Sequence, residues 1–313
     1  MKAILDLDTG IDDALALAYA LAHPELELIG VTCTYGNVTV PLAVRNTLAL
    51  LELLDRPDIP VFAGPSPDGF QPSEISAFIH GQNGVGEVAL SPSDKTEDTQ
   101  PAADFLVQAV RDYGDELVII PTGPSTTIAQ AMLADASFAT NAHIVMMGGA
   151  LTVPGNVSAW AEANISQDPD ATDYLFRHSQ DVTMVGLDVT LRTLLTEKET
   201  ARWRATGTAA GEIFADMVDY YIRAYATTAP HLAGCGLHDP LAVAVAADPS
   251  LVEVIETNMK TDTEGPTRGR TIADETRLSQ EPTAKVAVGV DNERFVSEFV
   301  DRLEELFRTV GAK

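Results

Sequence analysis

The stretch LDLDTGIDDALALAYAL (residues 5–21) places a cluster of negative charge between two apolar segments. Its aspartates are Asp6, Asp8, Asp12 and Asp13, which fall within eight residues. The only basic residue nearby is Lys2. The apolar run before the aspartates is typical of a buried strand, and Ile11, Leu15 and Ala18 recur at the spacing of one helix face. The stretch therefore predicts a strand, a charged turn and a helix, and something must neutralise the carboxylates if they are buried.

Strand-like and helix-like segments alternate along the rest of the chain. Strands are predicted over 2–8, 26–37, 59–64, 117–120, 142–150, 182–190 and 284–290. Helices are predicted over 11–23, 40–54, 102–114, 195–229 and 236–246, in the second half of 116–133, and at the C-terminal end. This alternation is typical of a parallel, doubly wound sheet with helices on both faces.

Three segments interrupt the alternation. Residues 65–99 are rich in Pro, Gly, Ser and charge and lack periodicity, so we expect a functional or mobile loop there. Residues 151–171 are predicted to form a second loop, and a Glu-Gly-Pro turn within 252–274 predicts a hairpin. With no linker or internal repeat, we expect one α/β domain over residues 1–313. It should have a mostly parallel, doubly wound central sheet, a helical insertion and a C-terminal hairpin.

The composition excludes several classes of partner. The chain carries 20 basic and 46 acidic residues, a net charge of −26, whereas nucleic-acid binding requires a basic face. No apolar run is long enough for a transmembrane helix, and Asp6 and Asp8 interrupt what would be the apolar part of a signal peptide. Two cysteines, Cys33 and Cys235, are too few for a disulfide framework or a Cys-rich zinc site. We expect a cytoplasmic protein that binds neither nucleic acid nor membranes.

Polar residues follow several of the predicted strands at the point where each strand ends. Asp8 follows the first strand, Asn37 the second, and Thr122 the strand over 117–120. Met147 ends a later strand, and His238 and Asp239 form a turn before a helix. Ligands of open parallel sheets bind beyond the carboxyl ends of the strands. These residues are therefore expected to meet at one edge of the sheet.

The aspartate cluster has two interpretations. Asp12 and Asp13 suit a helix N-terminus, where carboxylates accept hydrogen bonds from free amides and interact favourably with the helix dipole. That role leaves Asp8 unexplained, and carboxylates held close together either share protons or bind a cation. Oxygen ligands favour Ca²⁺ or Mg²⁺. Zinc is less expected, because His80 and His238 have no paired spacing.

Seven sequence blocks, taken in order, resemble one enzyme family. They are DLDTGIDDALAL (6–17), TYGNV (34–38), HGQNG (80–84), PTGPSTTIA (121–129), MMGGA with GNVSAWAEANISQDPDA (146–150 and 155–171), LHDPLAVA (237–244) and GPTRGRTIAD (265–274). The chain resembles the nucleoside hydrolases of the inosine–uridine-preferring type over nearly its whole length. It departs from them at Thr9, where most members have Pro, a position that shapes the turn and is not a ligand.

The resemblance implies a Ca²⁺-dependent enzyme that cleaves the N-glycosidic bond of ribonucleosides, of the uridine or inosine type, into ribose and free base. Ca²⁺ would be held by the carboxylates of Asp8, Asp13 and Asp239 and by the main-chain oxygen of Thr122. Asp8 would also serve as general base, and Asp6 would support the neighbouring loop. The residues implied to bind ribose are Asp12, Asn37, Asn156, Glu162 and Asn164, with Met147 lining the pocket.

The resemblance says less about the base of the nucleoside. His238 is expected near the leaving base as an acid or polar contact, and His80 to face the base from a Gly-rich loop that suits a lid. Tyr221 and Tyr225 are candidates for base contacts, with packing in the core as the alternative; Arg223 is equally open. The base preference is open too, and the family usually forms homodimers or homotetramers.

Two other functions are compatible with parts of the sequence. A phosphatase of the haloacid dehalogenase type also begins with a strand and a DxD motif, but it would leave the HDP and AEANI blocks without a role. A Ca²⁺-dependent nucleoside- or ribose-binding protein would keep the pocket without catalysis. Retention of both Asp8 and His238 favours the hydrolase over the binding protein.

Overall fold

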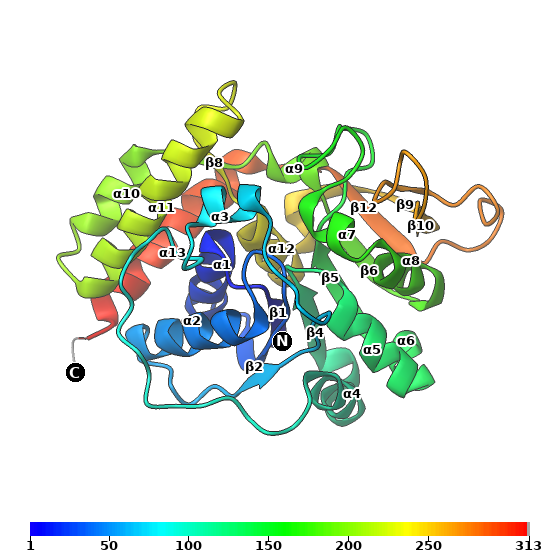
Figure 1. Cartoon of the computed structure of the whole chain (residues 1–313), viewed down its shortest axis with the longest axis horizontal. Helices are drawn as coiled ribbons and strands as arrows, with labels where there is room; N and C mark the ends of the chain where they lie inside the picture. The colour runs from blue at the N-terminus through cyan, green and yellow to red at the C-terminus, as the bar shows by residue number, and fades with distance from the viewer. Residues whose placement is uncertain (312–313) are drawn as a thin grey trace.

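The computed structural model describes residues 1–311 and is built around one large sheet (Figure 1). The strands of this sheet are β1 (Lys2–Leu7), β2 (Glu27–Cys33), β3 (Val61–Ala63), β4 (Leu117–Pro121), β5 (His143–Met147), β6 (Val182–Val185), β9 (Val252–Thr257) and β12 (Ala284–Val290). Their order is β3-β2-β1-β4-β5-β6-β12-β9, and every pairing is parallel except β12 with β9. The expected mostly parallel, doubly wound sheet is confirmed.

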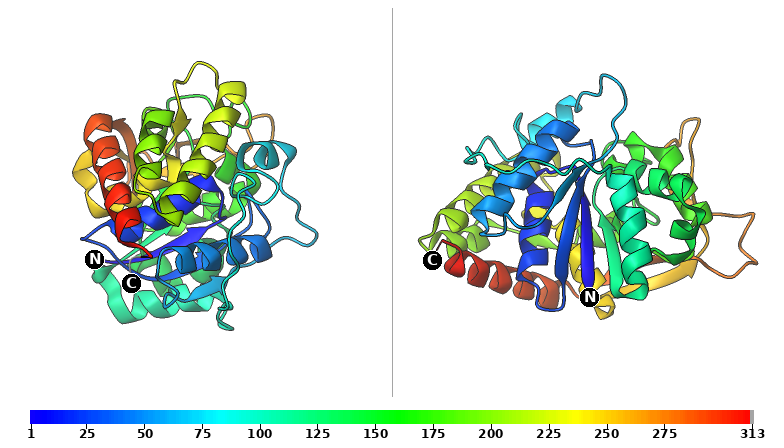
Figure 2. Two further views of the ribbon diagram at one scale, coloured as in Figure 1. Left: turned by 90° about the vertical axis from the view of Figure 1, so that its left-hand side faces the viewer. Right: turned by 90° about the horizontal axis from the view of Figure 1, so that it is seen from below.

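Helices pack on both faces of this sheet (Figure 2). They are α1 (Ile11–Ala22), α2 (Val40–Leu53), α3 (Glu74–His80), α4 (Ala102–Tyr113), α5 (Thr126–Ala134), α6 (Ala136–Asn141), α7 (Ala163–Gln167), α8 (Pro169–His178), α9 (Leu187–Thr190), α10 (Glu197–Arg204), α11 (Ala209–Thr228), α12 (His238–Ala247) and α13 (Asn292–Thr309). Alternate residues of β1 point to opposite faces: Leu5 joins a core with α1, α12 and α13, and Ile4 a core with α4, α5 and α8. A strand buried on both faces explains the continuous apolar run in the sequence.

The expected helical insertion consists of α10 and α11, which lie against the C-terminal helix α13 (Figure 1). Trp203 of α10 is fully buried and packs edge-on against Phe307 of α13, with ring centroids 5.7 Å apart. This apolar contact between α10 and α13 holds the insertion against the rest of the protein. The long helix α11 then carries Tyr221 and Tyr225 toward the carboxyl edge of the sheet.

Several predicted boundaries were wrong, mostly where short helices occur. The stretch 65–99 contains α3, which begins after Ser73, whose hydroxyl accepts the Ser76 amide. The predicted loop over 151–171 contains α7 and the start of α8. The strand predicted over 182–190 stops at Val185, and α9 follows. The unpredicted helix α6 follows α5 directly.

The C-terminal hairpin is shorter than predicted. Small antiparallel pairs are formed by β7 (Leu194–Leu195) with β8 (Cys235–Gly236) and by β10 (Met259–Thr261) with β11 (Thr271–Ala273). The second pair is the predicted hairpin. The start of the segment assigned to it, β9, belongs instead to the edge of the large sheet. Within residues 1–311, no helix is both long and apolar enough to cross a bilayer.

Candidate active site

The site lies where the strand order reverses, between β1 and β4. The chain proceeds from β1 outward to β2 and β3, then returns to the other side of β1 with β4. A crevice forms at such a point, beyond the carboxyl ends of the strands. Asp8 follows β1, Asn37 lies beyond the end of β2, and Thr122 follows β4 directly. The expected convergence of these polar residues is confirmed.

Asp8 and Asp13 are fixed by hydrogen bonds from different elements. The Asn37 amide N–H donates to Asp8 Oδ2 at 2.6 Å, and the Asn37 side-chain amide donates to Asp8 Oδ1 at 3.2 Å. Asp13, in the first turn of α1, accepts the Gly10 amide at 2.7 Å and the Thr122 hydroxyl at 2.8 Å. Asp13 therefore does cap the helix, as one interpretation of the sequence proposed. It also faces the end of β4, which capping alone does not require.

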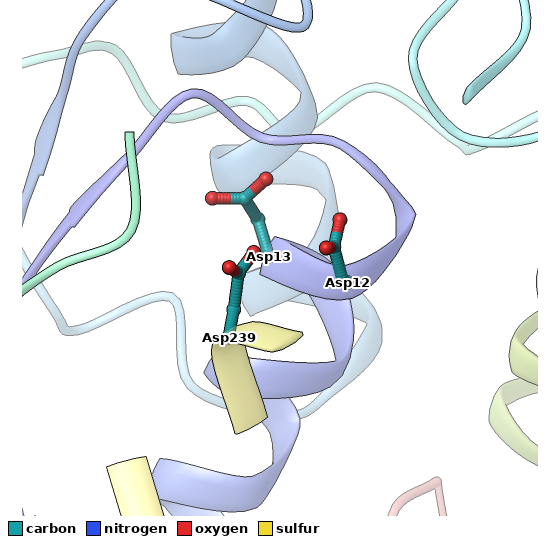
Figure 3. A group of neighbouring side chains, drawn as sticks. All are labelled: Asp12, Asp13 and Asp239. Atoms are coloured by element: carbon teal, nitrogen blue, oxygen red, sulfur yellow. The ribbon is translucent and has the colours of Figure 1, made fainter. Parts of the chain in front are cut away.

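Three carboxylates form a compact group at the base of the crevice (Figure 3). One oxygen from each of Asp12, Asp13 and Asp239 lies within 4.8 Å of the others, so the group could hold a metal ion. Asp12 and Asp13 come from α1, and Asp239 from the first turn of α12, rather than from a turn before the helix as the sequence analysis expected. The ligand set implied by the resemblance contained Asp8 where this group contains Asp12. Asp8 lies nearby but is held by Asn37.

These carboxylates are strongly disfavoured as anions in the protein alone. Burial, reinforced by the charge of Asp13, raises the pKa of Asp8 well above its ordinary value. Burial, with Asp12 as the next cause, does the same to the pKa of Asp239. Burial raises the pKa of Asp12 and of Asp13 to about 6. The donor set is thus buried and made of carboxyl oxygens that need a compensating positive charge to ionise, which fits a hard divalent cation.

A cavity of about 610 Å³ opens above the carboxylates. The predicted site residues that line it are Asp12, Asn37, His80, Thr122, Met147, Asn156, Glu162, Asn164, Tyr221, Tyr225, His238 and Asp239. Asp8 and Asp13 are fully buried beneath it. Arg223 is exposed and lies over the Tyr220 ring, so it does not reach the cavity. Among the described residues, the lining contains no lysine or arginine.

One side of the cavity is polar and preorganised. Glu162 accepts the amides of Gly149, Asn164 and Ile165 at 3.0 to 3.2 Å, which places its carboxylate at the start of α7. The side-chain amide of Asn164 donates to the main-chain oxygen of Thr122 at 2.6 Å. These contacts fix carboxylate and amide groups that recognise hydroxyls as donors and acceptors.

The cavity lining also contains two histidines and two tyrosines. His238 Nε2 lies 2.5 Å from the Tyr225 hydroxyl, and its Nδ1 lies 2.8 Å from the Thr190 hydroxyl. His80 Nδ1 accepts the Ile11 amide at 3.2 Å, which assigns the ring proton to Nε2. Burial lowers the pKa of His80 and of His238 to about 4, so both rings are neutral near pH 7. Tyr221 and Tyr225 are nearly fully buried, so they pack in the core and line the cavity at once.

Sequence reasoning missed some of the lining. His231, Leu232 and Leu191 line the cavity, and Thr190 bonds His238 from beneath. None of them belongs to a motif with a diagnostic spacing. The apolar residues carry no signal because isolated leucines are ordinary in any helix or loop. Only the position of His231 in a Pro- and Gly-containing segment after α11 hints at exposure near a site.

Comparison with known proteins agrees with this geometry. The family model described as inosine-uridine preferring nucleoside hydrolase matches residues 3–297. The probable uridine nucleosidase 2 of Arabidopsis thaliana is 36% identical over 97% of this chain and 98% of its own. The pyrimidine-specific ribonucleoside hydrolase RihA of Escherichia coli is 34% identical over the same shares.

A solved structure is more similar still. The purine-preferring ribonucleoside hydrolase from Gardnerella vaginalis is 56% identical and superimposes with a TM-score of 0.97, covering 98% of this chain and 99% of that one. The phosphatase alternative has no support in these matches. The whole-chain match and the shared fold lead to one conclusion: the chain belongs to the inosine-uridine preferring nucleoside hydrolase family.

Proposed function

We propose that the protein hydrolyses the N-glycosidic bond of ribonucleosides, with Ca²⁺, to give ribose and a free base. The observation that carries this proposal is a group of buried carboxylates at the floor of a cavity whose described lining offers carboxylate and amide groups but no lysine or arginine. A neutral, hydroxyl-rich sugar fits such a cavity, whereas a phosphate group would find no lysine or arginine in the described lining to pair with. The enzymatic names of the relatives support the same reaction.

The donor set supports Ca²⁺ as the ion. The residues that would hold it are Asp13 and Asp239, with Asp8, Asp12 and the main-chain oxygen of Thr122. Oxygen ligands of this kind, without a histidine or a thiolate, favour a hard cation over zinc. When bound, the ion would neutralise the carboxylates and make a coordinated water more acidic.

Asp8 is the general base in this proposal. Its carboxylate is oriented by both N–H groups of Asn37 and would accept a proton from the attacking water. Glycoside cleavage passes through a transition state with positive charge on the sugar. The neighbouring carboxylates of Asp12 and Glu162, fixed before substrate arrives, would stabilise that charge.

The sugar and the base would occupy opposite sides of the cavity. Ribose hydroxyls would be bound by Asp12, Asn37, Asn156, Glu162 and Asn164, with Met147 lining the pocket. The base would lie among His80, His238, Tyr221 and Tyr225. Both imidazoles are neutral near pH 7, so they would act on the leaving base by hydrogen bonding rather than as cations. His80 has its Nε2 proton available for this. Both ring nitrogens of His238 are bonded to the Tyr225 and Thr190 hydroxyls, so His238 would act through the Tyr225 hydroxyl.

The names of the relatives differ in the base they specify, from uridine to purines. We propose that this protein accepts both purine and pyrimidine ribonucleosides and prefers purines, because the purine-preferring enzyme is the more similar in sequence at 56% identity. The aromatic side chains on the base side suit either ring system by stacking.

A panel of nucleosides tests the proposal. Purified protein with CaCl₂ is incubated with inosine, adenosine, guanosine, uridine and cytidine, and reducing sugar is measured. Release of ribose from several of these, fastest from a purine, is expected. If no nucleoside yields ribose at high enzyme concentration with calcium bound, the protein is not a hydrolase, and nucleoside binding without turnover remains.

The remaining expectations are proposals about the assembled protein. We propose that residues 1–313 form one domain, because β1 and β12, from the two ends of the chain, belong to the same sheet. We also propose a cytoplasmic homodimer or homotetramer that does not bind nucleic acid, in line with the family and the net charge of −26. Light scattering after size exclusion distinguishes a monomer from these assemblies.

A further inference from the structure

The loop that follows β5 lines the cavity, and several of its side chains are exposed rather than packed in the core. Its cavity-lining residues are Val153, Pro154, Gly155, Asn156 and Val157. We call residues 151–157 the pocket loop. Three of these lining residues are exposed, so hydrophobic burial does not fix them. Because Asn156 is a proposed ribose contact, something else must set the position of this loop.

The backbone amides at the start of the pocket loop are hydrogen-bonded by Asp188 of α9. This carboxylate is almost fully buried. It accepts the Leu151 amide at 2.8 Å, the Thr152 amide at 2.7 Å and the Thr152 hydroxyl at 2.6 Å. A carboxylate that accepts several such bonds forms strong, charge-assisted contacts.

The backbone carbonyls of the same loop accept hydrogen bonds from the β10–β11 hairpin. The Arg270 guanidinium donates from Nη1 to the Val153 oxygen at 2.8 Å and from Nη2 to the Leu151 oxygen. Thr271, the next residue, accepts the Ala150 amide at 2.9 Å and donates to the Ala150 oxygen at 3.0 Å.

A glycine lets the hairpin approach this closely. Gly269 has φ +87°, and a Cβ there would lie 2.7 Å from the Ala161 Cβ, which follows the pocket loop in the chain. Consecutive residues of the hairpin thus contact the segment on both sides of Asn156.

We propose that Arg270 is a positioning residue for the nucleoside site, acting with Asp188 to clamp the pocket loop between two opposite charges. Arg270 binds the carbonyls and Asp188 the amides, so the backbone before Asn156 is held from both sides. The inference rests on the proposed function only through Asn156. A planar guanidinium can donate to two carbonyls at once, which a lysine ammonium on a flexible stem does less well.

The variants that test the clamp are Arg270→Gln and Arg270→Lys, with Arg268→Gln as the matched control. Arg268 is an exposed residue of the same hairpin, and its guanidinium donates to the Ser166 oxygen at 2.9 Å, outside the pocket loop. In R270Q, amide hydrogen exchange in peptides covering 151–157 is expected to rise at least tenfold, with R270K intermediate and R268Q unchanged. This measurement does not depend on hydrolysis. Unchanged exchange in R270Q overturns the clamp.

The link to catalysis is tested in the same variants. In R270Q, kcat/KM for inosine is expected to fall at least tenfold, mostly through KM, with Ca²⁺ affinity unchanged. In an Asn156→Ala background, Arg270→Gln should lower kcat/KM for inosine less than threefold, because the side chain that Arg270 positions is already absent. Additive losses mean that Arg270 acts on structure in general and contradict a positioning role. A wild-type enzyme inactive on every nucleoside refutes the proposed function instead, and the exchange measurement still decides the clamp.

Discussion

Asp12 is the clearest example of a residue prepared for a ligand. Its Oδ2 accepts the Tyr221 hydroxyl at 3.3 Å, whereas its Oδ1 is buried and has no hydrogen-bond partner in the structure described. The nearest basic atom, His80 Nδ1, lies 3.8 Å away and already accepts the Ile11 amide. A buried oxygen without a donor is costly, so a ligand hydroxyl or a cation that satisfies it gains that free energy on binding.

This arrangement predicts strong discrimination against 2′-deoxynucleosides. Removing the ribose 2′-hydroxyl would leave Asp12 unpaired in the complex, and sites built to bond a hydroxyl reject analogues that lack it by large factors. We expect kcat/KM for 2′-deoxyinosine to be at least ~10³-fold below that for inosine, or about 4 kcal/mol. Steady-state kinetics on both substrates measures the ratio. A ratio below tenfold means that Asp12 does not bind this hydroxyl.

Asp8 is predicted to matter for turnover rather than for folding. Asp8→Asn keeps the acceptor for the Asn37 amide but removes the base, so kcat for inosine should fall by ~10³ or more while the circular dichroism spectrum is unchanged. Asp6→Asn is the control, since Asp6 is equally buried but bonds Thr32 within the sheet, and it should lose less than ~tenfold. Comparable losses in both variants contradict the assignment of Asp8 as base.

At the scale of elements, the β10–β11 hairpin is fastened to the body of the protein by Asp274. Its carboxylate receives the Arg177 guanidinium at 2.9 Å and the Arg277 guanidinium at 2.8 Å. Burial opposes ionisation, but hydrogen bonds from Thr276 and Arg277 and the charge of Arg177 outweigh it and lower the pKa of Asp274 to about 2. The hairpin that carries Arg270 therefore depends on an ionised Asp274.

Asp274→Asn should destabilise the fold in a pH-dependent way. The pKa falls from 3.8 in the unfolded chain to about 2 in the folded one, so the stabilisation is complete above pH ~5 and is lost as pH falls toward 2. The shift corresponds to about 2 kcal/mol near pH 6, about half of which remains at pH 3. Urea unfolding of both proteins at the two pH values measures this. Glu275→Gln, exposed and paired with Lys260, is the control and should leave the free energy of unfolding unchanged at both pH values. If the difference in unfolding free energy between wild type and Asp274→Asn is as large at pH 3 as at pH 6, the account is contradicted.

The elements that the sequence predicted correctly are the long ones. α1 and α11 repeat apolar residues over several turns, and β1 contains the apolar run 3–5, so these elements are readable from the sequence. The helices α7 and α9 have one or two turns, too short for a period to be read. The N-cap of α7 is Glu162, which is not among the preferred N-cap residues. For β9, the sequence could not show that a strand next to a hairpin pairs with β12 instead, because that pairing is non-local.

At the scale of the whole molecule, the site could be predicted because one rule of parallel sheets brings strand ends together. The rule places four residues at one edge of the sheet but gives no distances between them; these residues are Asp8, Asn37, Thr122 and Met147. It could not say whether Asp8 or Asp12 would lie closer to Asp13 and Asp239, since that depends on how the first turn of α1 faces α12. Nor could it find the contact of Arg270 with Leu151, which joins residues 119 positions apart.

The whole fold also keeps positive charge away from the cavity. The lining carries carboxylates from α1, α12 and the start of α7. Without a cation, ionising all of these groups is disfavoured by burial and by their mutual repulsion. The buried carboxylate group supports the proposal that a divalent ion is needed for function, and this proposal is the central claim.

The most direct test is the activity of chelator-stripped protein as Ca²⁺ is added back. Ribose release from inosine is followed at rising Ca²⁺, and the bound ion is counted by equilibrium dialysis. We expect activity in the stripped protein to fall at least a hundredfold and to return in step with one Ca²⁺ per chain. Full activity in protein shown to contain no divalent ion would contradict the account.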